Sequence, residues 1–228
     1  MIPEYVNLIL LRLRQAGYEA YAVGGCVRDL LRGVTPHDWD VCTSAQPEEV
    51  EQVFSDLPRI DTGKKHGTVA VIVDRKPVEI TTFRADGAYL DNRHPDRVTF
   101  LDDLRGDLSR RDFTVNAMAL DENERPIDLF GGQEDLENGV IRTVGDPGER
   151  FREDGLRILR GLRFASRLDF SVEPATARAM MEERTLLHNI SAERVFSELN
   201  GILIGPAAGR ILRGFAPVIF TVLPESGR

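Results

Sequence analysis

Three acidic residues in two strand-like segments could perform chemistry at a phosphate. Asp38 and Asp40 stand two positions apart in HDWDVCT, which alternates polar and apolar residues. Residues two apart in a strand project to the same face, so this spacing predicts that the two carboxylates point together while Trp39 and Val41 point into the core. A third carboxylate, Glu79, lies in the strand-like PVEITTF.

Carboxylates held this close repel one another unless a cation or a proton intervenes, and hard oxygen ligands that face phosphates suit Mg²⁺. Asp38, Asp40 and Glu79 could supply a two-metal site, in which one ion activates an attacking hydroxyl and the other neutralises a leaving pyrophosphate. An isolated Asp-x-Asp is more often a solvent-facing strand edge. The preceding Gly24-Gly25 favours the catalytic interpretation.

The glycine pair interrupts a strand-like run, Tyr18–Val23, and leads into the helical CVRDLLRG. Glycines at such a turn let backbone N–H groups approach a phosphate, and Arg28 in the first helical turn could pair with triphosphate oxygens. Alone the pair is weak, because most such pairs are ordinary turns and this one is neither a Walker loop nor GxGxxG. Its value lies in the combination with the carboxylates.

A second group of residues could recognise a nucleobase. In the helical pattern of Glu153–Arg167, Asp154 and Arg157 stand three apart, so they are predicted to be neighbours that present an acceptor beside donors. Cytosine and adenine carry an amine donor beside a ring nitrogen acceptor, whereas uracil and guanine carry the reverse. The alternative is a solvated helix whose arginines face water.

The elements that must position these residues follow an α/β pattern and then a helical one. A helix is predicted at 3–16, with Val6, Ile9, Leu10 and Leu13 on one face, and a hairpin at Thr68–Val73 and Pro77–Phe83. Residues 84–97 have no period, which indicates a mobile loop. From about 147 onward the pattern is helical, as in Ala192–Leu203.

Composition limits the class of protein. The 228 residues are 42% hydrophobic, which is enough for an α/β domain with a helical extension. A net charge of −8 argues against nonspecific coating of nucleic acid. No apolar run approaches the roughly 18 residues that span a bilayer, and the two cysteines have no metal-site spacing. We expect a cytoplasmic protein with reduced thiols, no membrane association and no evident protein partner, truncated at its C-terminal end.

The order of the motifs resembles a known family. GGCVRDLL followed by HDWD resembles the signature of the DNA polymerase β-like nucleotidyltransferases, specifically the bacterial tRNA nucleotidyltransferase and poly(A) polymerase family. Further similar motifs follow in the family's order and cover nearly the whole chain: EITTFR at 79–84, RRDFTVNAMAL at 110–120, IDLFGG at 127–132 and EDGLRILRGLRFASRLDF at 153–170.

The resemblance implies a fold and a set of site residues. It implies an α/β catalytic head with a mixed sheet and flanking helices at 1–146, an all-α neck for base recognition at 147–205, and the start of a partial helical body at 206–228. Asp38 and Asp40 would hold the metals, and Glu153 would orient Arg157. The implied nucleotide-binding residues are Gly25, Arg28, Arg111, Asp112, Asn116, Asp154, Arg157, Arg160 and Arg163.

The implied activity is the template-independent addition of C, C and A to the 3′ end of tRNA, from CTP and ATP, with Mg²⁺ as cofactor and pyrophosphate as product. AYLDNRHPDRVTF at 88–100 resembles the flexible loop of CCA-adding and A-adding enzymes. Poly(A) polymerases of the family are generally more basic, so the acidic balance favours a tRNA-specific enzyme. A poly(A) or A-adding enzyme is the alternative, and a noncatalytic nucleotide- or RNA-binding module ranks below both.

Overall fold

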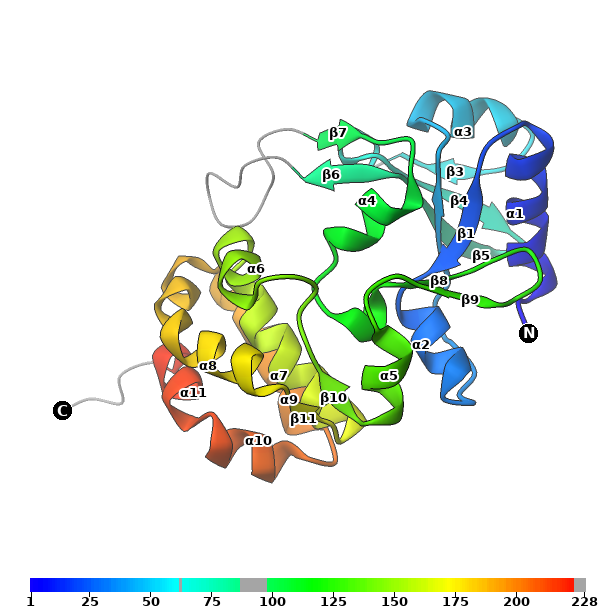
Figure 1. Ribbon diagram of the computed structural model, residues 1–228. Helices are drawn as coiled ribbons and strands as arrows, with labels where there is room; N and C mark the ends of the chain where they lie inside the picture. The colour runs from blue at the N-terminus through cyan, green and yellow to red at the C-terminus, as the bar shows by residue number, and fades with distance from the viewer. Residues whose placement is uncertain (62, 87–97, 224–228) are drawn as a thin grey trace. The chain divides into compact units, whose positions relative to one another are not determined.

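The computed structural model describes residues 1–61, 63–86 and 98–223, and it divides into two compact units (Figure 1). The first unit contains the described residues within Met1–Gly87, Arg97–Arg111 and Val115–Gly132. The second contains those within Asp112–Thr114 and Gln133–Arg228. The boundaries at 147 and 206 that the sequence suggests remain predictions.

A mixed sheet forms the centre of the first unit. In the described residues it has seven strands in the order β3-β4-β5-β2-β1-β8-β9, and only the β2–β5 pair is parallel. The strands are β1 (Ala20–Val23), β2 (Asp40–Thr43), β3 (Arg59–Ile60), β4 (Thr68–Val73), β5 (Lys76–Thr82), β8 (Met118–Leu120) and β9 (Pro126–Asp128). The predicted mixed sheet is therefore confirmed.

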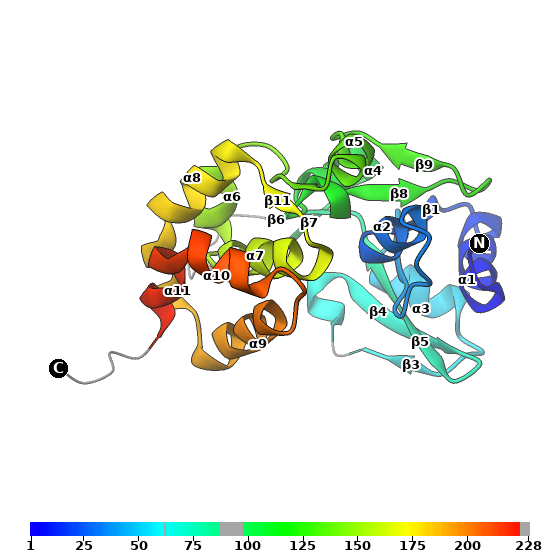
Figure 2. The ribbon, with the colours of Figure 1, turned by 90° about the horizontal axis from the view of Figure 1, so that it is seen from below.

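Helices pack against this sheet: α1 against β1, α2 against β1 and β8, and α3 against β4 and β5 (Figures 1 and 2). The helices are α1 (Glu4–Gln15), α2 (Gly25–Leu31), α3 (Pro47–Val53) and α4 (Leu104–Ser109), with short 3-10 turns η1 (Lys64–His66) and η2 (Thr114–Asn116). Leu104 and Leu108 of α4 join Val23, Cys42 and Phe83 in one buried cluster. This packing fixes the strand ends that carry the site.

Most local predictions for this unit are confirmed. The four residues predicted to line α1 are its buried residues, and Gly17 follows the helix end with a φ of +93°. The β4–β5 hairpin turns at Asp74 and Arg75, both with positive φ, which matches the twist that a two-residue hairpin loop needs. Both cysteines are buried, and neither forms a disulfide.

The absence of structure predicted for 84–97 is wrong at its start. The first three residues of the predicted loop form β6 (Arg84–Asp86). This strand pairs antiparallel with β7 (Val98–Phe100), which directly follows the predicted loop. A three-residue strand is too short to show a period in the sequence. The remainder of that loop, and most of the family-like segment at 88–100, lies outside the described residues.

In its described residues the second unit is helical apart from one short parallel pair of strands, β10 (Val140–Ile141) with β11 (Ser171–Val172). Figure 2 shows α7, α9 and α10 lying together in this unit. Its helices are α5 (Gly132–Glu137), α6 (Pro147–Glu153), α7 (Leu156–Leu168), α8 (Pro174–Glu182), η3 (Arg184–Asn189), α9 (Ala192–Leu203), α10 (Ala208–Gly214) and α11 (Ala216–Val222). The predicted helix at Ala192–Leu203 is confirmed.

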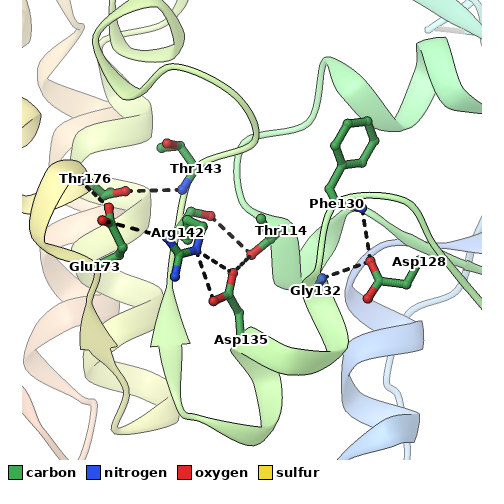
Figure 3. A network of polar contacts seen from close by, with 9 residues as sticks. All are labelled: Thr114, Asp128, Phe130, Gly132, Asp135, Arg142, Thr143, Glu173 and Thr176. Atoms are coloured by element: carbon green, nitrogen blue, oxygen red, sulfur yellow. Dashed lines mark hydrogen bonds and ion pairs between the residues drawn. The ribbon is translucent and has the colours of Figure 1, made fainter.

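A buried polar network anchors the segment Asp112–Thr114 in the second unit (Figure 3). The hydroxyl of Thr114 donates to Asp135 at 2.6 Å, and Arg142 Nε donates to both oxygens of the same carboxylate at 3.1 Å. Asp135 is only 4% exposed, so removing its partners would leave a buried acceptor unsatisfied. The network therefore fixes the backbone beside Asp112.

A separate turn in the first unit is closed by Asp128, whose Oδ1 accepts the backbone N–H groups of Phe130 and Gly132 (Figure 3). This turn ends the IDLFGG motif. Among the described residues, no helix combines the length and apolar character needed to cross a membrane.

Candidate functional site

The structure brings the three predicted carboxylates to one place in the first unit. Asp40 is the first residue of β2, and Glu79 is its register partner on the parallel strand β5, so their side chains share a face. Trp39 and Val41 are buried, as the alternating pattern predicts, whereas Asp38 and Asp40 are exposed. One detail of the prediction is wrong: β2 begins at Asp40, and Asp38 lies in the preceding bend.

Burial and the neighbouring acids raise the pKa of the Asp40 carboxyl. Burial by the surrounding protein is the largest cause, although the side chain still reaches solvent. Arg111 opposes the shift, and the negative charges of Glu79 and Asp38 add to it. Three like charges thus interact at this site, and a bound cation would relieve their repulsion.

This donor set fits Mg²⁺. No three His, Cys, Asp or Glu side chains of the described residues form a ready cage for a metal. Mg²⁺ in nucleotide enzymes, however, is usually held by one or two carboxylates and completes its shell with waters and substrate phosphates. Asp38 and Asp40 supply two such carboxylates with open sides, and Glu79 supplies a third beside Asp40.

Arg111 is held near these carboxylates by Asp107, which sequence reasoning missed. Arg111 donates to Asp107 at 3.2 Å, and Arg110 donates to the same carboxylate at 2.7 Å. Burial alone would raise the pKa of Asp107, but Arg111 and Arg110 outweigh it and lower that pKa. Asp107 is fully buried, so it holds Arg111 firmly, and Arg111 in turn provides positive charge beside Asp40.

Gly24 makes room for this arginine. Its φ is +88°, and a Cβ there would lie 2.9 Å from Nη1 of Arg111 and 3.9 Å from Oδ2 of Asp40. Any other residue would therefore be strained and would displace the guanidinium. Gly24 is thus the glycine that the turn requires, and the phosphate-binding role predicted for Gly25 stays a prediction.

Arg28 and Asn116, both predicted to bind nucleotide, are joined in the structure. Nη1 of Arg28 donates to Oδ1 of Asn116 at 2.7 Å, and Nε donates to Asp29 at 2.9 Å. Gly25 lies beside this arginine, since a Cβ at that position would be 3.6 Å from Nη2 of Arg28. The glycine turn and the RRDFTVNAMAL segment thus meet at one guanidinium.

The predicted base-reading pair is not on one continuous helix. α6 ends at Glu153, Asp154 has extended backbone angles, and α7 begins at Leu156. Next to the break, Gly155 lies close to η3, since a Cβ at that position would lie 3.0 Å from Cβ of Leu186. Asp154 instead accepts the N–H of Leu156, as acids at helix starts do.

Arg157 occupies the first turn of α7 and is held by its neighbours. Its side chain is 9% exposed, and Nη1 donates to Glu153 at 2.5 Å and to the carbonyl of Arg150 at 3.3 Å. The backbone N–H of Arg157 also donates to the carbonyl of Asp154. The Asp154 carboxylate, an acceptor, and the Arg157 guanidinium, a donor, are therefore close in the chain, and hydrogen bonds orient each of them.

The remaining predicted residues of the second unit, Asp112, Arg160 and Arg163, all form ion pairs. Asp112 accepts from both Nε and Nη2 of Arg160, at 2.8 and 2.7 Å. Burial would raise the pKa of Asp112, but Arg160 and Arg157 reverse the effect and lower it. Arg163 donates to Glu198 of α9 at 2.6 Å. Asp112 and Arg160 come together, whereas Arg163 is directed to a residue that the sequence analysis did not select.

Comparison with known proteins decides the family. Residues 20–142 match the family model of the poly(A) polymerase head domain, and residues 169–215 match one described as a probable RNA and SrmB-binding site of polymerase A. The chain belongs to the poly(A) polymerase head-domain family. The matched region contains both glycines, all three carboxylates and Arg111.

Curated members of this family are similar over most of the chain. It is 52% identical to the CCA-adding enzyme of Streptococcus suis over 86% of this chain and 48% of the relative. It is 46% identical to the CCA-adding enzyme of Limosilactobacillus fermentum over 96% of this chain and 54% of the relative. The chain thus spans about half the length of the curated relatives it matches.

Solved structures of the family share the fold. The CCA-adding enzyme of Bacillus stearothermophilus, in complex with CTP, matches with a TM-score of 0.86 and 45% identity, over 95% of this chain and 52% of that one. The Thermotoga maritima CCA-adding enzyme, complexed with tRNA_CCA, matches with a TM-score of 0.79 and 28% identity, over 100% of this chain and 54% of that one. Both solved CCA-adding enzymes thus share the fold of this chain over 95% or more of its length.

Proposed function

We propose that this chain carries the catalytic and nucleotide-selecting parts of a CCA-adding enzyme. It transfers CMP and then AMP from CTP and ATP to the 3′ end of tRNA and releases pyrophosphate. The first unit performs the transfer, and the second selects the base. The enzyme works in the cytoplasm, and its head, neck and body divide near residues 147 and 206.

The observation that carries this proposal is the immobilised pair of Asp154 and Arg157. An ionised carboxylate only accepts hydrogen bonds and a guanidinium only donates them. Cytosine and adenine offer an amine donor beside a ring nitrogen acceptor, which complements the pair, while uracil and guanine offer the reverse. Arg157 is buried against Glu153, so it cannot turn to suit the wrong base without leaving a charge unpaired.

The residues of the first unit supply the chemistry. Arg28 and Arg111 bind triphosphate oxygens, and Asn116 keeps Arg28 oriented. The 3′ hydroxyl of the RNA gives its proton to solvent water and attacks the α-phosphorus, and the bond from that phosphorus to the oxygen that bridges to the β-phosphate breaks to release pyrophosphate. When bound by Asp38 and Asp40, Mg²⁺ favours ionisation of that hydroxyl and neutralises the leaving group, and Glu79 adds negative charge beside Asp40.

Two features support CCA addition over addition of A alone. The curated relatives described above are named CCA-adding enzymes, at identities of 46 and 52%. The net charge of −8 suits a protein that selects its RNA instead of binding any RNA through a basic surface. The description of the family model, a poly(A) polymerase head domain, favours the alternative of a poly(A) polymerase.

Equilibrium binding of ATP, CTP, GTP and UTP to the 228-residue chain, with Mg²⁺, tests the proposal. CTP and ATP should bind while UTP and GTP bind about ten-fold or more weakly, on the scale of one bidentate base contact. Binding of ATP alone would indicate a poly(A) or A-adding enzyme. Equal binding of all four nucleotides would contradict the role of Asp154 and Arg157.

Transfer is tested on a tRNA that lacks its CCA end. Extension by C, C and A, seen as three discrete product lengths when CTP and ATP are supplied together, is expected. Selective nucleotide binding without any extension, at RNA concentrations that saturate binding, would favour the noncatalytic module. Omission of Mg²⁺ should abolish extension, and activity in a chelator would contradict the metal assignment.

A further inference from the structure

Asp154, to which the proposed function assigns base reading, is bonded through both carboxylate oxygens. Oδ1 accepts the backbone N–H of Leu156 at 3.0 Å, and Oδ2 accepts Nη2 of Arg194 at 3.1 Å. The first donor belongs to the adjacent turn of the chain. The second lies 40 residues away in α9. The carboxylate is therefore oriented from two independent elements.

α9 is closely fitted to α7, so it can act as a fixed support. Ser166 of α7 is fully buried and donates its hydroxyl to the carbonyl of Ile202 at 2.7 Å. A Cβ at Gly201 would lie 2.3 Å from Cδ of Arg163, and one at Gly205 would lie 2.6 Å from the carbonyl carbon of Ser166. Larger residues at these two positions would collide with the Arg163 side chain and with Ser166, and Figure 2 shows the two helices together.

The face of α9 that meets this region carries complementary charges. Arg194 and Glu198 are four residues apart, which places them on the same side of the helix. Arg194 pairs with the acid Asp154, and Glu198 pairs with the base Arg163 at 2.6 Å. One helix thus holds two of the residues assigned to the nucleotide, each by an opposite charge.

The ion pair with Asp154 accounts for the position of the Arg194 guanidinium. Its Nη1 is buried and has no hydrogen-bond partner among the described residues. A buried, unpartnered N–H destabilises a protein, so the guanidinium does not occupy this position for its own hydrogen bonding. The two side chains of the pair are 25% and 16% exposed, which limits screening of their attraction by solvent.

We infer that Arg194 is a positioning residue for base selection: it fixes the Asp154 carboxylate so that its remaining lone pairs face the exocyclic amine of cytosine or adenine. This inference rests on the proposed function. Arg194 does not touch the base itself. Without it, the Leu156 N–H still restrains one oxygen, but the carboxylate can turn about that bond and its alignment with Arg157 is lost.

The test compares the Arg194→Met and Arg194→Lys variants of the 228-residue chain with the wild type. The measured quantity is the ratio of UTP to CTP dissociation constants with Mg²⁺. We expect Arg194→Met to lower this ratio by about ten-fold, the scale of one charge-assisted hydrogen bond, and Arg194→Lys to restore most of it. Binding of tripolyphosphate, which has no base, should be unchanged in both variants.

Two further variants separate positioning from general loss of structure. Arg210→Met removes an exposed ion pair with Asp169 in the same unit and should leave the ratio unchanged. Asp154→Asn combined with Arg194→Met should lower the ratio no further than Asp154→Asn alone, because both act through one carboxylate. Additive effects would overturn the inference.

The outcomes distinguish this inference from the proposed function. A wild type that binds CTP and UTP equally overturns the proposed function and the inference together. A selective wild type whose selectivity survives in Arg194→Met overturns the inference alone. Equal weakening of CTP, UTP and tripolyphosphate in Arg194→Met also overturns it, since this indicates a structural role only.

Discussion

The two charged clusters of the molecule are built on opposite plans. In the first unit Asp38, Asp40 and Glu79 are exposed, and among the described residues their carboxylates form no hydrogen bond or ion pair. In the second unit the acids are each paired with an arginine: Glu153 with Arg157, Asp154 with Arg194, Asp112 with Arg160 and Glu198 with Arg163. The first cluster has excess negative charge, whereas each acid of the second cluster is neutralised by an arginine of the protein.

The difference follows from what each cluster binds in the proposed function. Cations must be attracted, so neighbouring carboxylates whose mutual repulsion a cation would relieve are suited to the task. A nucleobase is neutral and is selected by the direction of hydrogen bonds, so its partners must be fixed before it arrives. Substitutions in the first cluster should therefore change chemistry and spare folding, whereas those in the second should change selection or stability.

The largest effect is expected from Asp40→Asn. Loss of a metal carboxylate should slow nucleotide transfer about a thousand-fold or more, which corresponds to roughly 4 kcal/mol of activation free energy. Stability should not fall, because the change removes like-charge repulsion with Asp38 and Glu79. Primer extension and thermal unfolding measure the two quantities.

Asp74→Asn is the matched control for this change, since Asp74 is an exposed residue of the β4–β5 turn and asparagine tolerates its positive φ. It should alter neither quantity. Transfer by Asp40→Asn at the wild-type rate would contradict the metal site, and a large loss of stability would contradict the contrast between the clusters.

Asp107→Asn should have the largest effect on folding. Asp107 is fully buried between Arg110 and Arg111, so removing its charge leaves both arginines poorly compensated and should lower the free energy of unfolding by about 3 kcal/mol at neutral pH. Urea titration measures this. Asp56→Asn, which removes an exposed partner of Arg12, should change the free energy of unfolding far less, because solvent screens this pair.

The same variant has a defined pH dependence. The pKa of Asp107 is lowered by folding, so its stabilising contribution is complete above the usual aspartate pKa of about 3.9 and is lost as pH falls through the lower folded value. The difference in unfolding free energy between wild type and Asp107→Asn should therefore be constant at neutral pH and shrink below about pH 4. A difference that grows on acidification would contradict the ion-pair assignment.

An intermediate effect, on selection alone, is expected from Asp154→Asn. The amide keeps the shape but can donate as well as accept, so UTP and GTP should gain about ten- to thirty-fold relative to CTP and ATP. Transfer of CMP should slow much less than in Asp40→Asn, because no metal carboxylate changes. Competition between CTP and UTP in primer extension measures the ratio, and unchanged competition would show that Asp154 does not read the base.

Local patterns predicted the first unit better than the second. The four buried residues of α1, the β4–β5 hairpin and the alternation around Asp40 all depend on periods of 3.6 or 2, which a sequence displays directly. Contacts between distant segments leave no such trace. Arg194 reaches Asp154 across 40 residues and was therefore not predicted. Asp107 and Arg111 stand four apart, a spacing that the sequence does display, but the burial that makes this pair strong could not be read from it.

The break at Asp154 shows why the predicted pair was placed on one continuous helix. Charged and apolar residues repeat with helical spacing through Glu153–Arg167, and that spacing does not reveal that Gly155 meets Leu186. Asp154 takes extended backbone angles between the two helices, and α7 begins at Leu156. A signal was present in the glycine itself, since glycine within a helical pattern often marks a close backbone approach.

The smallest effect is expected from Arg160→Lys, which tests whether the paired cluster depends on geometry or on charge alone. Arg160 donates to Asp112 through two nitrogens, and a lysine would keep the charge but lose one of these bonds. The free energy of unfolding should fall by about 1 kcal/mol, the value of one hydrogen bond. Urea titration beside Arg210→Met, whose exposed pair should contribute less, measures the difference. Equal stability of Arg160→Lys and wild type would mean that charge balance suffices, and that the second unit differs from the first in pairing but not in precise alignment.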